Sequence, residues 1–336
     1  MRRNREVPRG RIERLEIDSD VLRGNLQGDP TRRELHVYLP SGHTDGAGLP
    51  LLVDLVGFTG SGISHTNWRA FGENLPERLD RLIGEGTMGP VVVAFPDCFT
   101  RLGGNQYINS AALGRYEDYL LEEVVPLVER RFYCGGAGKR GVFGKSSGGY
   151  GAIVHAMRNG GFWNAAACHS GDMAFELTYG CDMPASLNEL AKHGRSIPAF
   201  IAHFEKSPKP TEREVHTLMF LAMAATYDPD PSQPLGIRLP CDPETVEPIP
   251  ERWANWLAHD PVLMVERSVE SLRRLKGLFI DCGDRDQFHL HYGSRRLHRA
   301  LDRLGIAHVY EEFPDDHSNI DYRMDRSLPF LERALR

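Results

Sequence analysis

Short, continuous runs of apolar residues constrain the fold of this chain more than any other feature. LPLLVDLVG at 49–57, GPVVVAFPD at 89–97 and KGLFIDCG at 276–283 are runs of this kind. A strand that is apolar on both faces is typical of a parallel sheet covered by helices. Helical patterns such as YEDYLLEEVVPLVERRF at 116–132 separate these runs, and the alternation predicts an α/β fold with a mostly parallel sheet.

Other segments extend the same alternation. Further strands are predicted at RIERLEI, RELHVYLP, KRGVFG, FWNAAACHSG and HVYEEFP. Helices are predicted from about Trp68 to Ile83, from Ser146 to Arg158 and from Tyr322 to Leu335. Pro126 predicts a kink or a late start within the helix at 116–132, because proline lacks the N–H that the helix requires.

One long section departs from this pattern. Residues 172–266 contain no convincing buried strand and hold 12 of the chain's 22 prolines. Three helical pieces are predicted within them: PASLNELAKHG, TEREVHTLMFLAMAATY and ERWANWLAHD. We therefore expect an α/β core at 1–171 and 267–336 that carries a cap or lid insertion at 172–266, since long insertions are usually functional. A rigid structural embellishment or a dimerisation arm is the alternative, and TLMFLAMAA fits core burial as well as an acyl-contacting lid.

Composition excludes several classes of partner. The net charge is −6 with no long basic run, which argues against nucleic acid. No apolar stretch reaches about 18 residues, so no membrane span is expected. The arginine-rich start, MRRNREVPRGR, lacks the apolar core of a signal peptide. The six cysteines form no C-x-x-C pair, and we expect reduced thiols in a cytoplasmic protein.

The stretch GVFGKSSGGYG at 141–151 contains the motif that best indicates a chemical reaction. It resembles the end of a phosphate-binding loop, but that loop needs a glycine where Lys139 stands. It also contains Gly-Lys-Ser-Ser-Gly, a G-x-S-x-G nucleophile elbow between a predicted strand and a predicted helix. This context predicts Ser146 as a nucleophile, with Ser147 as a donor of its backbone N–H rather than as a rival hydroxyl.

A serine hydroxyl needs a base, and the base needs an orienting carboxylate. In α/β-hydrolases these follow the serine in the order acid, then histidine. His317 follows the last apolar run, and IDCGDRDQF offers Asp286 with Asp284 as an open alternative. Asp281 is still within the strand. We therefore predict the triad Ser146, Asp286 and His317.

Other polar and aromatic residues are assigned around this triad. The second oxyanion donor is predicted to be the backbone N–H of Phe58, since VGF lies in the loop after the third strand. Trp68 and the loop at 103–110, with Tyr107, are candidates for substrate contact, although ordinary packing is equally compatible. The HLH at 289–291 places two imidazoles at i, i+2, which diverge on a helix, so no metal site is expected there.

These motifs resemble the putative-esterase branch of the α/β-hydrolases, which includes esterase D and feruloyl esterases. FGKSSGGYGA is similar to the family's nucleophile element, IDCGDRDQF to its acid loop and PDDHSN to its histidine loop. The resemblance implies an α/β-hydrolase fold and places the catalytic groups on Ser146, Asp286 and His317. It covers most of 11–171 and 270–336 but not 172–266.

The sequence thus predicts a serine esterase that cleaves small-molecule carboxylic esters without a metal or organic cofactor. An acyltransferase or thioesterase with the same triad is the alternative within enzymes. A catalytically silent binding protein is the alternative from another class. A homo-oligomer is possible, and the natural ester is not identified.

Overall fold

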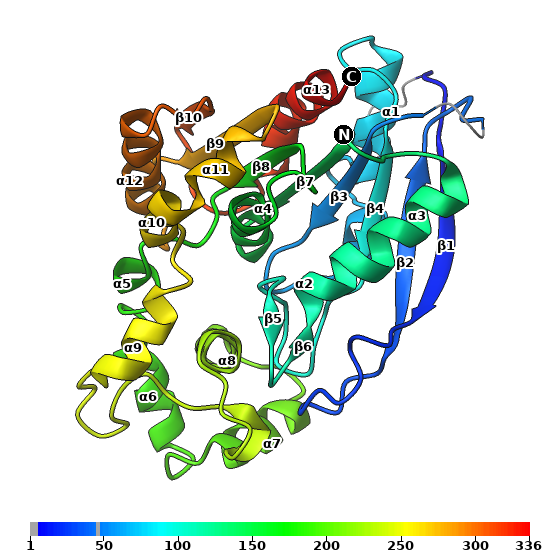
Figure 1. Cartoon of the computed structure of the whole chain (residues 1–336). Helices are drawn as coiled ribbons and strands as arrows, with labels where there is room; N and C mark the ends of the chain where they lie inside the picture. Colours follow the sequence, from blue (N-terminus) through cyan, green and yellow to red (C-terminus); the bar gives the residue numbers. More distant parts are fainter. Residues whose placement is uncertain (1–5, 45–47) are drawn as a thin grey trace.

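The sheet and its helices follow the predicted alternation. The structure is a computed structural model that describes residues 6–44 and 48–336; residues 1–5 of the arginine-rich start lie outside the described residues. Over the described ranges, the main sheet has eight strands in the order β1-β2-β4-β3-β7-β8-β9-β10 (Figure 1). The strands are β1 (Arg11–Asp18), β2 (Arg32–Leu39), β3 (Leu51–Leu55), β4 (Val92–Pro96), β7 (Arg140–Lys145), β8 (Ala165–His169), β9 (Gly277–Gly283) and β10 (Val309–Phe313).

Strand direction divides the sheet into two parts. The pairs β1–β2 and β2–β4 are antiparallel, and every pair from β4 to β10 is parallel. A separate two-residue ladder pairs β5 (Asn109–Ser110) with β6 (Gly114–Arg115). The parallel strands all end at one edge, where the loops that follow them meet.

The helices cover both faces of the sheet. The longer ones are α1 (Leu75–Gly84), α3 (Val125–Phe132), α4 (Ser147–Arg158), α6 (Met183–Ala191), α7 (Ile197–Lys206), α8 (Glu212–Tyr227), α9 (Pro250–Leu257), α12 (Leu290–Arg303) and α13 (Met324–Leu335). Shorter helical segments are η1 (Gly62–Thr66), α2 (Tyr116–Asp118), η2 (Tyr119–Val124), α5 (Phe175–Thr178), η3 (Pro234–Gly236), α10 (Pro261–Met264), η4 (Val265–Ser268), α11 (Val269–Arg273) and η5 (Ile320–Arg323). The first large hydrophobic cluster joins one face of the sheet to α3, α4, α12 and the 172–266 helices, and the second joins the other face to α1 and α13.

Local sequence explains why one helix begins later than predicted and why another has the irregular turn that Pro126 predicts. The helix expected from Trp68 begins only at Leu75, because Asn74 caps it with a reciprocal Glu77 capping box and Pro76 lies in its first turn. The helix at 116–132 contains a π-helical segment, η2, immediately before α3, whose first turn holds Pro126. Proline donates no backbone hydrogen bond, which accounts for the irregular turn before it.

Residues 172–266, all of which the structure describes, form helices and no strand. The three predicted helical pieces correspond to α6, α8 and α9, whereas α7 was not predicted. In Figure 1 the helices α5 to α9 form a group beside the sheet, away from α1 and α13. The apolar segment of α8 from Phe220 to Ala225 is buried, so it forms core rather than an exposed apolar surface.

Aromatic rings connect this group to the rest of the molecule. Phe175 of α5 lies 6.0 Å from the ring of Tyr150 in α4 and 4.9 Å from that of Tyr227 in α8. The Tyr150 hydroxyl donates to the carbonyl oxygen of His259 at 3.1 Å. The insertion and α4 thus share one continuous core. Across the described residues, every helix falls short of the length and apolarity that a membrane crossing requires.

This shared core predicts a single unfolding transition. Replacing the fully buried Phe175 with alanine should lower the free energy of unfolding by about 3–5 kcal/mol, because a large cavity opens where the rings meet. Phe71→Ala, at a side chain that is 96% exposed, should change it by less than about 0.5 kcal/mol. Urea denaturation followed by tryptophan fluorescence and far-UV circular dichroism measures both. Two separate transitions would contradict the shared core.

Candidate active site

Ser146 occupies a sharp turn between a strand and a helix. It follows β7 and precedes α4, and its backbone has φ 59° and ψ −125°. This conformation is strained for a residue with a side chain and is retained only where the surroundings hold it. The Ser146 N–H donates to the carbonyl oxygen of His169 at 3.0 Å, and the Ser146 carbonyl accepts from the Tyr150 N–H at 2.8 Å.

Two glycines let β3 approach this turn. A Cβ added at Gly144 would lie 2.2 Å from the Leu55 carbonyl oxygen, and one added at Gly148 would lie 1.8 Å from it. Real Cβ atoms cannot approach an oxygen so closely, so both positions require glycine. The next loop glycine, Gly57, lies beside the serine, since a Cβ there would be 3.4 Å from the Ser146 Cβ.

The predicted acid and base are hydrogen bonded to each other. The Asp286 Oδ2 lies 2.7 Å from the His317 Nδ1, and both side chains are buried. The Phe288 N–H donates to Asp286 Oδ1 at 2.9 Å, and the His317 N–H donates to the Gln287 side-chain oxygen at 3.0 Å. These contacts fix the carboxylate and the histidine loop relative to one another.

The alternative acids have other partners. Asp284 lies in an exposed turn with the Arg285 guanidinium 3.4 Å away. Asp281 bonds to His169 at 2.6 Å and accepts from Arg323 at 2.8 Å. Among the predicted triad residues in the described ranges, the hydrogen bond present is that between Asp286 and His317. The contact of His317 with Ser146 therefore belongs to the proposal below.

A residue that the sequence did not single out lies between the serine and histidine loops. Gln106, fully buried, donates from Nε2 to the Ser147 Oγ at 3.0 Å and to Asp172 Oδ2 at 3.1 Å. Burial raises the pKa of Asp172, and the nearby His317 opposes that rise. Gln106 thus links the side chain of the residue after the nucleophile to a buried carboxylate. The loop at 103–110 was expected near the site, but nothing in its sequence distinguishes Gln106 from its neighbours.

The predicted oxyanion donors flank the elbow. Ser147 is the first residue of α4, where backbone N–H groups have no intrahelical acceptor. Phe58 follows Gly57, which lies beside Ser146, and the Phe58 carbonyl accepts from the Gly104 N–H at 2.6 Å. This hydrogen bond fastens the loop that carries Phe58 to the loop at 103–110.

The two aromatic candidates lie in different environments. Trp68 is 68% exposed and lines a pocket of about 270 Å³. Tyr107 is buried with φ 60°, and its hydroxyl donates to the Val56 carbonyl oxygen at 2.6 Å. The Tyr107 ring therefore supports the strand end that leads to Phe58. Direct contact of either ring with substrate stays a prediction.

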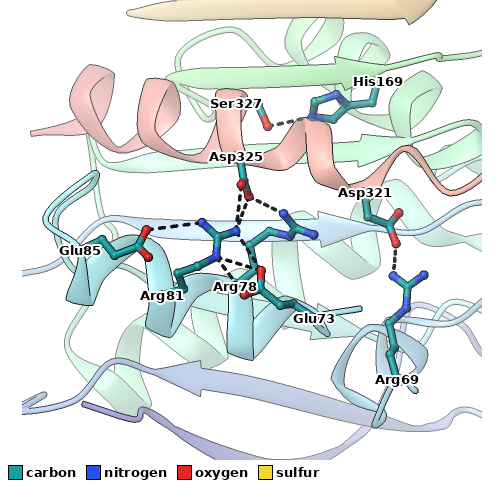
Figure 2. Close-up of polar contacts among 9 residues, drawn as sticks. All are labelled: Arg69, Glu73, Arg78, Arg81, Glu85, His169, Asp321, Asp325 and Ser327. Atoms are coloured by element: carbon teal, nitrogen blue, oxygen red, sulfur yellow. Dashed lines mark hydrogen bonds and ion pairs between the residues drawn. The ribbon is translucent and has the colours of Figure 1, made fainter. Parts of the chain in front are cut away.

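A second serine–histidine–aspartate arrangement lies on the α13 face of the sheet. His169 bonds through Nδ1 to Asp281 at 2.6 Å. Through Nε2 it bonds to the Ser327 Oγ at 2.8 Å (Figure 2). All three side chains are buried, and Ser327 lies within the regular helix α13. These bonds join β8, β9 and α13, which is a structural role.

One group of side chains has the composition of a metal site. His298, Asp302 and His308 hold their potential ligand atoms within 4.8 Å of one another. His298 Nδ1 and His308 Nε2 are 2.8 Å apart and satisfy each other by a hydrogen bond. Residues of the HLH motif do not belong to this group: His289 has φ 65° at the start of α12 and His291 packs on Tyr292.

Comparison with known proteins agrees with this geometry. The family model described as "Putative esterase" matches residues 30–325, which is most of the chain. The chain belongs to this esterase family. Membership makes it a carboxylic ester hydrolase by class, and it confirms the α/β-hydrolase fold and the resemblance noted from the motifs. No curated protein sequence matches the chain significantly.

Solved structures show the same fold at low identity. A ferulic acid esterase is 17% identical with a TM-score of 0.62, over 97% of this chain and 99% of that one. A fluorophosphonate-binding serine hydrolase of Staphylococcus aureus is 18% identical with a TM-score of 0.60, over 96% and 99%. An S-formylglutathione hydrolase from Agrobacterium tumefaciens is 16% identical with a TM-score of 0.59, over 99% and 98%.

The close approach of β3 to the elbow of this esterase-family chain gives a test. Gly148→Ala should destabilise the protein by several kcal/mol, roughly the upper range for single substitutions, because the added Cβ collides with the Leu55 carbonyl. Gly72→Ala is the matched control, since a Cβ there meets nothing within 4 Å. Thermal unfolding of both variants measures the effect. Equal melting temperatures would contradict the described packing of β3.

Proposed function

We propose that the chain is a serine esterase that hydrolyses carboxylic esters through Ser146, His317 and Asp286. The observation that carries this proposal is the Asp286–His317 hydrogen bond, in a chain whose Ser146 occupies a strained elbow at a helix N-terminus. His317 Nδ1–H donates to the buried carboxylate, which leaves Nε2 with the lone pair that a general base needs. Membership of the esterase family supports the same chemistry.

The reaction proceeds in two halves. His317 Nε2 takes the proton of Ser146 Oγ while Oγ attacks the ester carbonyl carbon, and Asp286 stabilises the imidazolium. The backbone N–H groups of Phe58 and Ser147 donate to the oxyanion. His317 then protonates the departing alcohol, which leaves Ser146 acylated. Water, deprotonated by His317, releases the carboxylic acid and restores Ser146.

We further propose that residues 172–266 form a fixed cap over this site rather than an independent lid. Two observations support a fixed position. The helix α8 is buried in the core, and its Met223 sulfur lies 3.0 Å from Gln106 Nε2. Gln106 also bonds to Ser147, so the cap is linked to the residue after the nucleophile.

The cysteines are consistent with a cytoplasmic location, which we also propose. All six are free, and five of them are buried: Cys98, Cys134, Cys168, Cys241 and Cys282. Burial raises the pKa of Cys134 to about 12. Such thiols stay protonated and unreactive at neutral pH.

Covalent labelling tests the identity of the nucleophile. A fluorophosphonate probe should label the protein, and Ser146→Ala should lose the label because no other activated hydroxyl remains. Ser147→Ala should still be labelled, since its useful group is the backbone N–H, which the substitution keeps. Intact-protein mass spectrometry reads both variants. A Ser146→Ala protein that is labelled as fast as the unsubstituted chain contradicts the proposal.

The orienting carboxylate can be tested separately. Asp286→Asn should lower kcat by roughly 10³- to 10⁴-fold, because the amide favours the wrong imidazole tautomer. Asp284→Asn, in the exposed turn two residues earlier, should change kcat by less than about twofold. Steady-state kinetics with a chromogenic acetyl ester measures both variants. If Asp284→Asn caused the large loss, the acid would be misassigned.

A further inference from the structure

The pocket that contains Trp68 is lined by residues that follow the two catalytic loops in the chain. It is lined by Ser64, His65, Asn67, Trp68, Arg69, Glu73, Asn74, Leu75, Arg78, Asp321 and Met324. The loop that carries Phe58 continues into η1, and the loop that carries His317 continues into η5. The pocket therefore lies between the continuation of the oxyanion loop and the continuation of the histidine loop.

Lys145 is adjacent to the nucleophile in the chain and lies on the same side of the sheet as this pocket. It precedes Ser146, and two residues before it Phe143 packs in the α1–α13 cluster, so strand alternation directs Lys145 to the same face. Burial lowers the pKa of Lys145, and the carboxylates of Asp321 and Asp286 oppose that shift. The Lys145 side chain has no hydrogen bond or ion pair with any described residue, while its backbone belongs to the β7–β8 ladder.

Two arginines of the pocket keep most of their donors unused. Arg69 bonds to Asp321 through Nη1, and Arg78 bonds to Asp325 through Nη1 (Figure 2). Within the described ranges, the other nitrogens of these two guanidinium groups have no acceptor. The Arg69 side chain is 40% exposed. Each arginine is therefore held in place by one nitrogen, and Arg69, the more exposed of the two, keeps two others to offer a ligand.

The nearby acceptors are mostly occupied. Both carboxylate oxygens of Glu73 accept from Arg81, and both oxygens of Asp325 accept from the same arginine at 2.8 Å (Figure 2). Asp321 accepts from Arg69 through Oδ2 and retains Oδ1. Unused donors thus outnumber unused acceptors around the pocket.

His65 contributes an imidazole to the same pocket. Its Nδ1 bonds at 2.5 Å to Oδ2 of Asp54, a buried carboxylate on β3. Burial disfavours the charged imidazole, but the field and hydrogen bond of Asp54 outweigh it and raise the pKa of His65. The hydrogen bond to Asp54 therefore fixes the orientation of the His65 ring within the pocket.

We propose that this pocket binds an anionic group, a carboxylate or a phosphate, on the alcohol part of the ester. Anions satisfy arginine donors with charge-assisted, often bidentate hydrogen bonds. The alcohol side follows from the histidine loop, because His317 protonates the departing alcohol and η5 continues that loop to Asp321. This inference rests on the proposed esterase function and specifies its substrate class as acidic esters.

Matched synthetic esters test the inference on the unsubstituted protein. 4-Carboxyphenyl acetate and 4-phosphonophenyl acetate are compared with neutral 4-carbamoylphenyl acetate, each corrected for its rate with hydroxide. We expect kcat/KM to be about tenfold or more higher for an anionic ester at low ionic strength. The ratio should approach one near 1 M salt, because mobile ions screen exposed charges. The two anionic esters distinguish a carboxylate site from a phosphate site.

Substitutions locate the effect. Arg69→Gln should reduce the anionic-to-neutral ratio by about fivefold or more, since it removes the exposed donors. Arg295→Gln is the matched control: Arg295 is 39% exposed and pairs with Glu312 away from the pocket, so the ratio should not change. Thermal unfolding verifies that Arg69→Gln is folded. If Arg69→Gln is not folded, the proposal is tested by the salt dependence of the anionic-to-neutral ratio in the unsubstituted protein.

Three results have distinct meanings. Equal kcat/KM for the anionic and neutral acetates overturns the anion pocket while leaving the esterase intact. A preference that appears only when the carboxylate is on the acyl part, in mono(4-nitrophenyl) glutarate against 4-nitrophenyl pentanoate, also overturns it. Absence of both fluorophosphonate labelling and hydrolysis of every ester overturns the proposed function instead.

Discussion

The contact between the end of β3 and the glycines around Ser146 is the constraint on which the site depends. The Leu55 carbonyl occupies the space where side chains at Gly144 and Gly148 would lie. This close approach brings the loop after β3, with Gly57 and Phe58, against the serine. It also permits α4 to start immediately after β7, so that its first N–H groups are directed at the turn. The sheet order β3-β7-β8 then places the loops of three parallel strands around one point.

Continuity of the hydrophobic core supports the proposal that the long insertion keeps a fixed position. The rings of Phe175 and Tyr227, both in the insertion, pack against the ring of Tyr150. Tyr150 belongs to α4, the helix that begins at the elbow. Movement of the insertion would therefore expose aromatic surface and disturb the helix that supports the nucleophile. Tight packing of this kind favours a rigid site.

Much of the fold could be predicted from the sequence because the relevant signals are local. Apolar runs marked every strand of the main sheet, and the glycine pattern around Ser146 indicated the elbow. The start of α1 at Leu75 was missed because the aromatic residues at 68 and 71 were included in the helical pattern, although they precede the capping residue Asn74. α7 was missed although Ile197, Phe200, Ile201 and Phe204 recur at helical spacing within it.

The site could be predicted only in part, because some of its contacts form between residues that are distant in sequence. The spacing of the acid and histidine loops is set by the fold, so Asp286 and His317 could be selected, and the structure joins them by a hydrogen bond. Gln106 and Asp172 meet only through tertiary structure, and neither has a sequence signature. Tyr107 was selected for its aromatic ring, whereas burial and the hydrogen bond to Val56 give that ring a supporting position.

The buried Ser327–His169–Asp281 arrangement has a wider consequence. A template defined by three side chains and their separations would match it as well as a catalytic triad. Ser327 is fully buried within helix α13, whereas Ser146 is half-buried and has a strained backbone. Three side chains at suitable separations are therefore not enough to identify a nucleophile, since backbone conformation and accessibility distinguish these two serines.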